Sequence, residues 1–315
     1  MRKVKLILNP MADMGRAWRV ANDLRPIVSQ YGRADWSGTV YPTHAMELAR
    51  QAALDGYDLV VAMGGDGTVH EVVNGLMQVP AEKRPALGIV PIGSGNDCAH
   101  ALGIPKDAIQ AMAHALSGTT GSMDIGLMTD ELGHKEYFDN SLGVGFNTIV
   151  TIHSHKLPIL RGFAMYFAAV IQTILFNHDP VKIQMDFGGQ KFEDEVQMIA
   201  LCNGPREGGG FVLTPGAVPD DGLLNHIVVR KVNRPTMFAL LIAVIRGTHA
   251  SFSQVSLGTC KNISLLSEKP MYIHTDGEVI TSFGSNIRHI SVEILPDALR
   301  VVKGFSKTLK VSQPD

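Results

Sequence analysis

The sequence predicts two domains: an N-terminal α/β domain whose parallel sheet is flanked by helices, and a C-terminal antiparallel β-sandwich. The chain has 315 residues, more than the roughly 250–300 that a single hydrophobic core usually serves. Strand and helix patterns alternate in the first third, and strands with a period of two dominate after Gly118. We place the domains at residues 1–118 and 119–298, and expect the tail at 299–315 to pack back on the first domain.

Four short apolar runs in the first domain each precede a segment with helical spacing, which is typical of strands in a parallel sheet. These predicted strands are Val4–Leu8, Thr39–Tyr41, Leu59–Met63 and Leu87–Pro91. Turn-forming residues follow each of them. Because ligands of open α/β sheets gather beyond the carboxyl ends of the strands, we expect the four turns to converge on one site.

The second domain reads as a series of short strands separated by turns. Apolar and polar residues alternate in Val181–Phe187, and Gly188-Gly189 follows as a hairpin turn. Further strands are predicted at Gln197–Cys202, Leu223–Val229, Asn262–Ser267, Met271–Thr275, Glu278–Phe283 and His289–Leu295. Two apolar helices, Gly162–Asn177 and Pro235–Arg246, interrupt them, and either a core-facing or a lipid-facing role fits their spacing.

Composition excludes several classes of protein. The net charge of −2 argues against a nucleic-acid binder and supplies no polybasic membrane anchor. The three cysteines are far apart, so we expect reduced thiols in a cytoplasmic protein. The first apolar run is too short for a signal peptide, which needs roughly 7–15 apolar residues. The longest apolar stretches also fall short of the roughly 20 residues that cross a bilayer, so we expect no transmembrane segment.

The segment GGDGT, at 64–68, is the first candidate for ligand binding. Gly64, Gly65 and Gly67 allow positive φ and close backbone approach, and consecutive amides at the start of the next helix would attract an anion. Thr68 and Glu71 have the spacing of a capping box, which predicts that the helix begins at Thr68.

Asp66 lies within this glycine-rich segment, where its charge should oppose a phosphate. At about 4 Å and an effective dielectric near 20, that repulsion is about 4 kcal/mol. A Mg²⁺ ion between the two groups reverses the sign, because carboxylate and phosphate oxygens are its usual ligands. Asp66 therefore suggests a metal–nucleotide complex, and a simple tight turn is the alternative.

A second loop repeats this pattern after the next strand. Gly93-Ser94-Gly95 is followed by Asn96-Asp97 at the predicted start of a helix, where Asp97 is either an N-cap or a second ligand for the same metal. The loop is not a dinucleotide fingerprint, because Cys98 stands where the third glycine would be, and the chain contains no G-x-x-x-x-G-K-[ST] motif.

Together, NPMADMG, GGDGTVHEVVNG and PIGSGNDCAHALGI resemble the diacylglycerol kinase catalytic domain family, which includes bacterial soluble lipid kinases and sphingosine kinases. PDDGLL and HTDGE extend the resemblance over nearly the whole chain. GGDGT alone is shared with NAD kinases and, as a close variant, phosphofructokinases. The resemblance implies an ATP- and Mg²⁺-dependent transfer of phosphate to a lipid hydroxyl, in a cleft between a phosphofructokinase/NAD kinase-like domain and a β-sandwich.

The resemblance also assigns residues. Asp66 and Asp97 would organise metal and phosphates, and Glu278 would be the general base on the lipid hydroxyl. The residues implied to contact ATP are Asn9, Thr43, Gly64, Gly65, Asp66, Gly67, Thr68, His70, Gly93, Ser94, Gly95 and Asn96. From the residues alone, Asp276-Gly277-Glu278 is also a hairpin signal. A third acid on the second domain nevertheless suits a proton acceptor.

A second, structural Mg²⁺ is implied at PGAVPDDGLL, held by Asp221 and the backbone carbonyls of Val218 and Leu223. Without the resemblance this segment reads as a turn. His153 and His155 lack nearby carboxylate or thiolate partners, so we expect an exposed loop there. The chain departs from the common family pattern at Ser94, where threonine is frequent, and at Cys98-Ala99-His100, where an aromatic residue and an arginine are usual.

These observations lead to a lipid kinase that acts from the cytoplasm at the inner face of the membrane, with diacylglycerol as the first candidate substrate and phosphatidic acid as its product. Phosphatidylglycerol and sphingoid lipids offer the same hydroxyl nucleophile. An NAD kinase-like activity would use the same first loop. A non-catalytic lipid-binding protein would bind ATP without transfer, and the family likeness suggests a homodimer.

Overall fold

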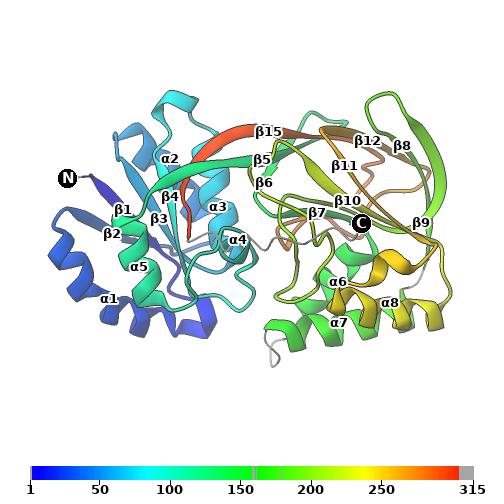
Figure 1. The fold of residues 1–315 in the computed structure, drawn as a ribbon, viewed down its shortest axis with the longest axis horizontal. Coiled ribbons are helices and arrows are strands. Elements are labelled where there is room, and N and C mark those ends of the chain that lie inside the picture. The colour runs from blue at the N-terminus through cyan, green and yellow to red at the C-terminus, as the bar shows by residue number, and fades with distance from the viewer. Residues whose placement is uncertain (1, 158–159, 161, 178, 305–315) are drawn as a thin grey trace, which may run out of the picture.

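The computed structural model describes residues 2–157, 160, 162–177 and 179–304, which form two lobes side by side (Figure 1). The first lobe is built on a parallel sheet in the order β2–β1–β3–β4. Its strands are β1 (Val4–Leu8), β2 (Ala34–Gly38), β3 (Leu59–Gly64) and β4 (Ala86–Pro91). Both β3 and β4 are buried along their whole length, as continuous apolar runs require in a sheet covered on both faces.

Helices cover this sheet on its two faces. They are α1 (Ala17–Tyr31), α2 (His44–Leu54), α3 (Asp66–Met77), α4 (Asp97–Ala101) and α5 (Ala108–Ser117), with short 3₁₀ turns at Ala12–Gly15 and Ala81–Lys83. α1 packs with α5, and α2 packs with α3. A Cβ on Gly75 would overlap the backbone of Met46, so the glycine allows α2 and α3 to approach closely.

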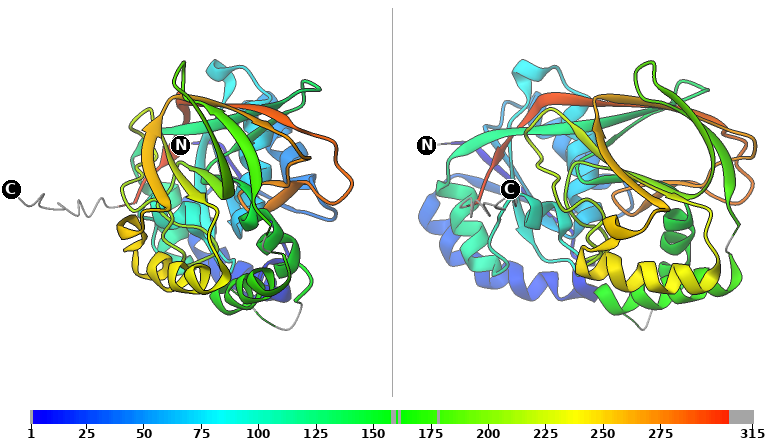
Figure 2. Two further views of the ribbon diagram at one scale, coloured as in Figure 1. Left: turned by 90° about the vertical axis from the view of Figure 1, so that its right-hand side faces the viewer. Right: turned by 45° about the vertical axis from the view of Figure 1, so that its right-hand side comes forward.

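The second lobe is an antiparallel β-sandwich, which confirms the predicted fold class (Figure 2). Its strands are β5 (Thr120–Asp130), β6 (Lys135–Phe138), β7 (Ser141–Gly145), β8 (Val181–Asp186), β9 (Lys191–Cys202), β10 (Leu224–Arg230), β11 (Val255–Cys260), β12 (Asn262–Ser267), β13 (Ile273–Thr275), β14 (Glu278–Thr281) and β15 (His289–Val302). The helices α6 (Phe146–Ser154), α7 (Gly162–Phe176) and α8 (Arg234–Arg246), with a 3₁₀ turn at His249–Ser251, pack on one side of these strands.

Two long strands join the lobes. β5 pairs with β15 from Asp130↔Ile290 to Thr120↔Val302, and Val301 also pairs in parallel with Leu87 of β4. The first hydrophobic core includes Met123 and Ile125 of β5, together with residues 299, 301 and 302 of β15. The chain therefore passes between the two cores within continuous strands. The part of the predicted tail from 305 to 315 lies outside the described residues.

The structure corrects several predicted elements. Thr39–Tyr41 is not a strand, because β2 ends at Gly38 and is only partly buried at the sheet edge. The sequence pattern did not predict β5, β6, β7, β11, the first half of β9 or α6. His153 is not in an exposed loop: it lies within α6, is buried, and its Nδ1 is 3.1 Å from Thr173 Oγ1. His155, just beyond that helix, is exposed.

The apolar helix α7 has two different faces. Ala169 and Ile174 are fully buried in the core that α7 shares with α6, α8 and the sheet. Phe163, Leu175 and Phe176 are exposed, and no residue of α7 carries a charge. The buried face fits the core-facing interpretation, and the lipid-facing interpretation stays a prediction for the exposed face. Within the described residues, the helices are all too short or too polar to cross a membrane.

Candidate active site

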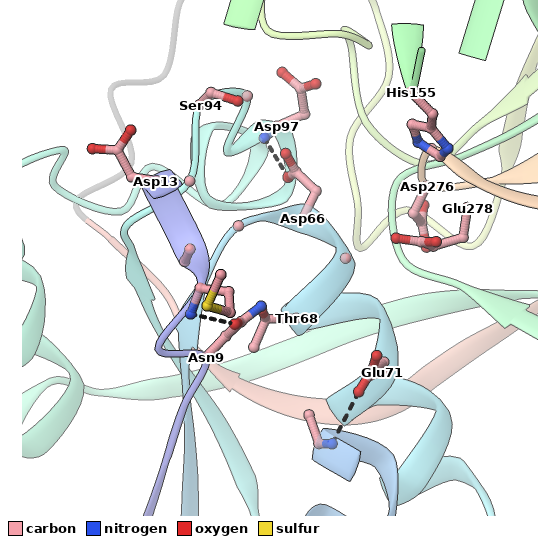
Figure 3. Close-up of a pocket in the computed structure, with 18 of the residues that line it drawn as sticks. Asn9, Asp13, Asp66, Thr68, Glu71, Ser94, Asp97, His155, Asp276 and Glu278 are labelled. Carbon is pink, nitrogen blue, oxygen red and sulfur yellow. Dashed lines mark hydrogen bonds between the residues drawn. The ribbon is translucent and has the colours of Figure 1, made fainter. Parts of the chain in front are cut away.

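A cleft of about 640 Å³ opens between the two lobes at the carboxyl end of the parallel sheet. Figure 3 shows Asp66 and Asp97 on one side of it, with Asp276, Glu278 and His155 opposite. Of the predicted site residues, the cleft is lined by Asn9, Gly65, Asp66, Gly67, Thr68, Gly93, Ser94, Gly95, Asp97 and Glu278. The turns beyond the strands of the first domain therefore do converge, as the topology requires.

The two glycine loops touch each other. A Cβ on Gly93 would lie 2.3 Å from the Cα of Gly65, and a Cβ on Gly95 would lie 2.7 Å from Asp66 Oδ2. Both distances are below what side-chain carbons tolerate, so glycine is needed here for close approach. Gly64, Gly65 and Gly67 do not use the positive φ that glycine also allows, so the close backbone approach is the reason for glycine here. The residue with a left-handed backbone is Asn96, whose side chain accepts from Gly93 N and donates to Gly93 O.

Asp66 links the two loops. Its Oδ1 accepts a hydrogen bond of 2.6 Å from the backbone N–H of Asp97 at the start of α4, shown dashed in Figure 3, and a longer one from Cys98 N. Burial raises the pKa of Asp66, and these backbone donors partly oppose the shift. The carboxylate thus has a structural role, because it satisfies N–H groups that a helix start leaves without an intrahelical partner.

The side chain of Asp97 is held by the second domain. Its Oδ2 accepts from Gly209 N at 2.9 Å. Arg206 Nε lies 2.7 Å from its Oδ1, out of line for a directed hydrogen bond, so this contact is an ion pair. Burial and then the nearby charge of Asp66 raise the pKa of Asp97 to about 7, while Gly209 N and Arg206 oppose the shift. Asp97 is therefore not the N-cap of its own helix.

The predicted capping box at Thr68 and Glu71 is wrong. α3 begins at Asp66, and its N-cap residue, Gly65, has no side chain to cap it. Glu71 instead reaches the neighbouring helix α2, where its carboxylate accepts from Thr43 N at 2.8 Å and Ala45 N at 2.9 Å. Thr43 itself has a left-handed backbone and does not line the cleft.

Thr68 lines the cleft, and its hydroxyl is hydrogen-bonded to the turn after β1. Asn9 Nδ2 donates to Thr68 Oγ1 at 3.1 Å, and Asn9 Oδ1 accepts from Met11 N. A Cβ on Gly64 would overlap that hydroxyl. These contacts fix the turn after β1 against the start of α3. Gly64 and Asn96 do not line the cleft. Gly64 packs against Thr68, and Asn96 hydrogen-bonds to Gly93 within the second loop.

Glu278 extends from β14 toward the first glycine loop. A Cβ on Gly67 would lie 2.6 Å from Glu278 Oε1, so this carboxylate contacts the backbone of α3 across the interdomain boundary. The N–H groups of a first helical turn have no intrahelical partner, and Asp66 and Gly67 in that turn line the same cleft. The candidate base and the anion-attracting helix end therefore face the same space.

His70 is buried, does not line the cleft, and bonds to acidic side chains of the second domain. Its Nδ1 lies 2.8 Å from Asp276 Oδ2, and its Nε2 lies 3.0 Å from Glu136 Oε1. Burial lowers the pKa of His70, but the bonds to Asp276 and Glu136 outweigh it and raise the pKa well above its usual value. A direct contact of His70 with a nucleotide does not fit this geometry.

Asp276 is fully engaged by protein donors. Besides His70, its carboxylate accepts from the backbone N–H groups of Asp139, Asn140 and Ser141 at 2.9–3.0 Å. Burial raises the pKa of Asp276, but these donors, His70 first, outweigh it and lower the pKa below its usual value. The cluster of His70, Asp139 and Asp276 has metal-ligand spacing, yet the lone pairs of Asp276 are already used by protein donors.

The oxygens of Asp66 and Asp97 fit a hard divalent cation. A Cβ on Gly95 would lie 2.7 Å from Asp66 Oδ2 and 3.5 Å from Asp97 Oδ2, so both oxygens face the same glycine. Asp97 Oδ1 is instead paired with Arg206. Two neighbouring acids with raised pKa values are the environment that a cation relieves. An all-oxygen donor set favours Mg²⁺ over softer metals.

The segment predicted to hold a structural Mg²⁺ forms a tight turn. Asp221 Oδ1 accepts from Leu223 N at 3.0 Å, and burial raises the pKa of Asp221, with Asp124 and Asp220 adding to the shift. Val218 is 45 % exposed. Asp124, almost fully buried, accepts from Gly222 N and Asp297 N and so holds this turn to β15.

Sequence reasoning missed several residues that shape the site. Arg206, Glu207 and Gly208 come from the loop after β9, and Tyr166 comes from α7; all but Arg206 line the cleft. The glycine run at 208–210 after a predicted strand was a usable signal, because it resembles the other loops of the site. Tyr166 had no such signal, since an aromatic residue in an apolar helix is usually core.

Comparisons with known proteins agree with this architecture. Residues 3–128 match the model of the diacylglycerol kinase catalytic domain, and residues 140–303 match that of the YegS C-terminal NAD kinase beta sandwich-like domain. The chain therefore belongs to the family of diacylglycerol kinases and YegS-like lipid kinases, as its motifs indicated.

Individual relatives are similar over nearly their whole length. A diacylglycerol kinase of Bacillus subtilis is 28% identical over 302 residues, covering 93% of this chain and 96% of that protein. A probable lipid kinase YegS-like of Chromohalobacter salexigens is 33% identical over 270 residues, covering 85% and 81%. The crystal structure of a putative diacylglycerol kinase from Bacillus anthracis superposes with a TM-score of 0.78 at 25% identity, covering 96% of this chain and 97% of that one.

Proposed function

We propose that the protein transfers the γ-phosphoryl group of ATP to a lipid hydroxyl in a Mg²⁺-dependent reaction, and that diacylglycerol is its acceptor and phosphatidic acid its product. One observation carries this proposal. Glu278, from the second domain, lies against Gly67 in the same cleft as the two glycine loops. An acceptor hydroxyl beside Glu278 would face a phosphate bound at the start of α3.

The first domain supplies the nucleotide site. Glycine at 65, 67, 93 and 95 leaves the backbone without side chains where phosphates would lie, and the N-terminal end of α3 favours negative charge. Asp66 and Asp97 would hold Mg²⁺, which when bound neutralises charge on the transferring phosphate. Asn9 and Thr68 form the neighbouring wall of the cleft.

Glu278 supplies the base. As the lipid oxygen bonds to the γ-phosphorus, the O–H proton passes to the Glu278 carboxylate and the bond from that phosphorus to the bridging oxygen of ADP breaks. His70 and Asp276 keep the turn before Glu278 rigid through a buried hydrogen-bond network. Such positioning and charge stabilisation account for most of the catalysis in phosphoryl transfer.

The second domain supplies an apolar environment for a lipid. An apolar pocket enclosed by α6, α7, α8 and the sheet adjoins the cleft and shares Tyr166, Glu207 and Gly208 with it. The exposed apolar side chains of α7 suit contact with a bilayer surface. As part of this proposal, the protein works in the cytoplasm at the inner face of the membrane, and a homodimer stays a prediction.

Transfer of radiolabelled phosphate from ATP tests the proposal. The acceptors are diacylglycerol, phosphatidylglycerol and a long-chain sphingoid base in mixed micelles, and NAD without lipid. We expect Mg²⁺-dependent labelling of diacylglycerol above all others. Labelling of NAD alone would assign the NAD kinase-like activity instead, and ATP binding without transfer to any acceptor would assign a non-catalytic role.

A further inference from the structure

We propose that Asn147, which lies in a polar cluster with His274 and Glu207, recognises the ester linkage of an uncharged acceptor lipid, and that the apolar pocket beside it holds the first methylene groups of the adjoining acyl chain. The inference rests on the proposed function, because it names the lipid chemistry that this site selects. Its three residues come from separate elements: α6, β13 and the loop after β9.

The cluster lies where the cleft meets the apolar pocket. Glu207 lines both, and Asn147 lines the apolar pocket, whose walls are otherwise almost entirely hydrocarbon. The pocket is small, about 80 Å³, against about 640 Å³ for the cleft. It therefore accommodates only the start of an acyl chain, the part next to the ester.

Asn147 is the most telling member. Its side chain is buried, and among the described residues neither its amide nitrogen nor its amide oxygen has a hydrogen-bond partner. Buried polar groups are almost always paired, because leaving one unpaired in an apolar environment costs free energy. An amide left unpaired on the wall of a pocket next to a cleft points to a ligand that supplies the missing bonds.

His274 lies against Asn147 and lines neither the cleft nor the apolar pocket. A Cβ on Gly143 would overlap both Asn147 Nδ2 and His274 Nε2, so the two nitrogens lie together above that glycine. His274 Nδ1 accepts from Gly277 N at 3.4 Å. Its Nε2 lies 3.3 Å from Glu207 Oε1 but out of line for a hydrogen bond. The amide N–H groups of Asn147, on the wall of the apolar pocket, are therefore the donors that match a carbonyl acceptor.

Charge selects against anionic headgroups. No lysine or arginine is among the described residues that line the cleft or the apolar pocket, whereas Asp66, Asp97, Glu207 and Glu278 all do. A phosphodiester next to Glu207 would meet like charge in a partly desolvated site. An uncharged diacyl lipid avoids this repulsion and also brings the carbonyl that the donors lack.

The test compares a short-chain diacylglycerol with the dialkyl ether of the same chain length, which keeps the hydroxyl and lacks both carbonyls. Steady-state kinetics in mixed micelles give kcat/KM for each lipid. We expect the wild-type protein to favour the ester about tenfold, the upper range for a lost hydrogen bond. In Asn147→Leu the ester should lose this advantage through a higher KM, while values for the ether stay unchanged.

Asn262→Leu, an exposed asparagine at the start of β12, is the matched control and should keep the tenfold preference. Asn147→Leu removes an unpaired amide, so its melting temperature should equal or exceed that of the wild type. If it nevertheless fails to fold, Asn147→Ala takes its place with the same expected loss of preference.

The outcomes separate the two proposals. No transfer to either lipid by the wild-type protein would contradict the proposed function itself. Transfer with an ester-to-ether ratio that is the same in Asn147→Leu and wild type would overturn the role of Asn147. Preference for phosphatidylglycerol or a sphingoid amine over diacylglycerol would overturn the selection of an uncharged ester.

Discussion

Asp66 shows how one carboxylate can serve both the fold and the chemistry. One oxygen accepts the backbone N–H of Asp97 and so fixes the second loop to the first. The other oxygen faces Gly95 and Asp97 on the cleft side. From sequence, Thr68 looked like the cap of the region, and the acid therefore looked free for a metal alone. The contact that corrects this view joins residues 31 positions apart, which no local pattern reveals.

At the residue scale, Glu278→Gln tests the base directly. Glutamine has almost the same shape but cannot accept the proton of the lipid hydroxyl, so kcat should fall by about 10²–10⁴-fold. The Kd for Mg·ATP should change little. Glu293→Gln, at an exposed position of β15, is the control and should retain normal turnover. Unchanged kcat in Glu278→Gln would remove the role assigned to this residue.

The proposed metal-binding role of Asp97 predicts that metal binding depends on pH. With its pKa raised to about 7, the carboxyl is largely protonated at pH 6 and ionised at pH 8. Since Mg²⁺ binds the ionised form, the Kd for Mg·ATP should rise by up to about tenfold per pH unit below 7 and level off above it. Calorimetry at pH 6 and 8 measures this change, and Asp97→Asn gives the background from titration of the nucleotide. Equal pH dependence in both proteins would contradict the assignment.

The His70–Asp276 pair should contribute stability over a defined pH range. His70 has a raised folded-state pKa, so its contribution is complete below about 6.5 and is lost as pH rises through that folded-state value. Asp276 has a lowered pKa, so its contribution is present above about 3.9 and is lost as pH falls through its folded-state value. Between these limits the pair is ionised and intact.

His70→Gln should therefore lower the free energy of unfolding by about 3 kcal/mol at pH 6, because it breaks a buried charged pair. The difference from wild type should shrink as pH rises through the folded-state pKa of His70. Urea unfolding at several pH values measures both quantities. His134→Gln, on an exposed side chain that pairs with Asp130, is the control and should have little effect. A difference that does not depend on pH would indicate packing alone.

At the scale of elements, β1, β3, β4 and both glycine loops were predictable, because continuous apolar runs and turn residues are local signals. The half-exposed edge strand β2 was misplaced. Glu71 was not: its capping-box spacing was genuine, but α3 starts two residues earlier and Glu71 caps α2 instead. β7 was missed because SLGVG contains two glycines, and Gly143 is there to admit the side chains of Asn147 and His274. The close packing at Gly143 thus weakens the sequence signal of its own strand.

Contact between the two glycine loops can be tested with alanine. In Gly93→Ala the new Cβ overlaps the backbone of Gly65, and the backbone cannot rotate away. We expect the free energy of unfolding to fall by about 1–3 kcal/mol, as is usual for overpacking, together with weaker ATP binding. Gly216→Ala has open space around the added methyl and is the control. Equal melting temperatures for the two variants would show that the loops separate freely.

At the scale of the whole molecule, β5 and β15 should make the two lobes unfold together. Both tryptophans, Trp18 and Trp36, lie in the first lobe, so their fluorescence reports on that lobe alone. Far-UV circular dichroism reports on both lobes. We expect the two signals to give the same urea midpoint, as in a two-state transition. Separate midpoints would show that the long strands unpair before the cores do.

The paired strands β5 and β15 also determine how the cleft can change its width. Near residues 296–298 the register of β5 and β15 shifts, and Asp297 has a left-handed backbone beside the buried Asp124. A covalent linker of loose chain would let the lobes swing at almost no elastic cost. Here any rotation of one lobe against the other must twist a hydrogen-bonded pair of strands. The distance between Glu278 and the glycine loops should therefore have a preferred value, and the paired strands should oppose displacement from it elastically.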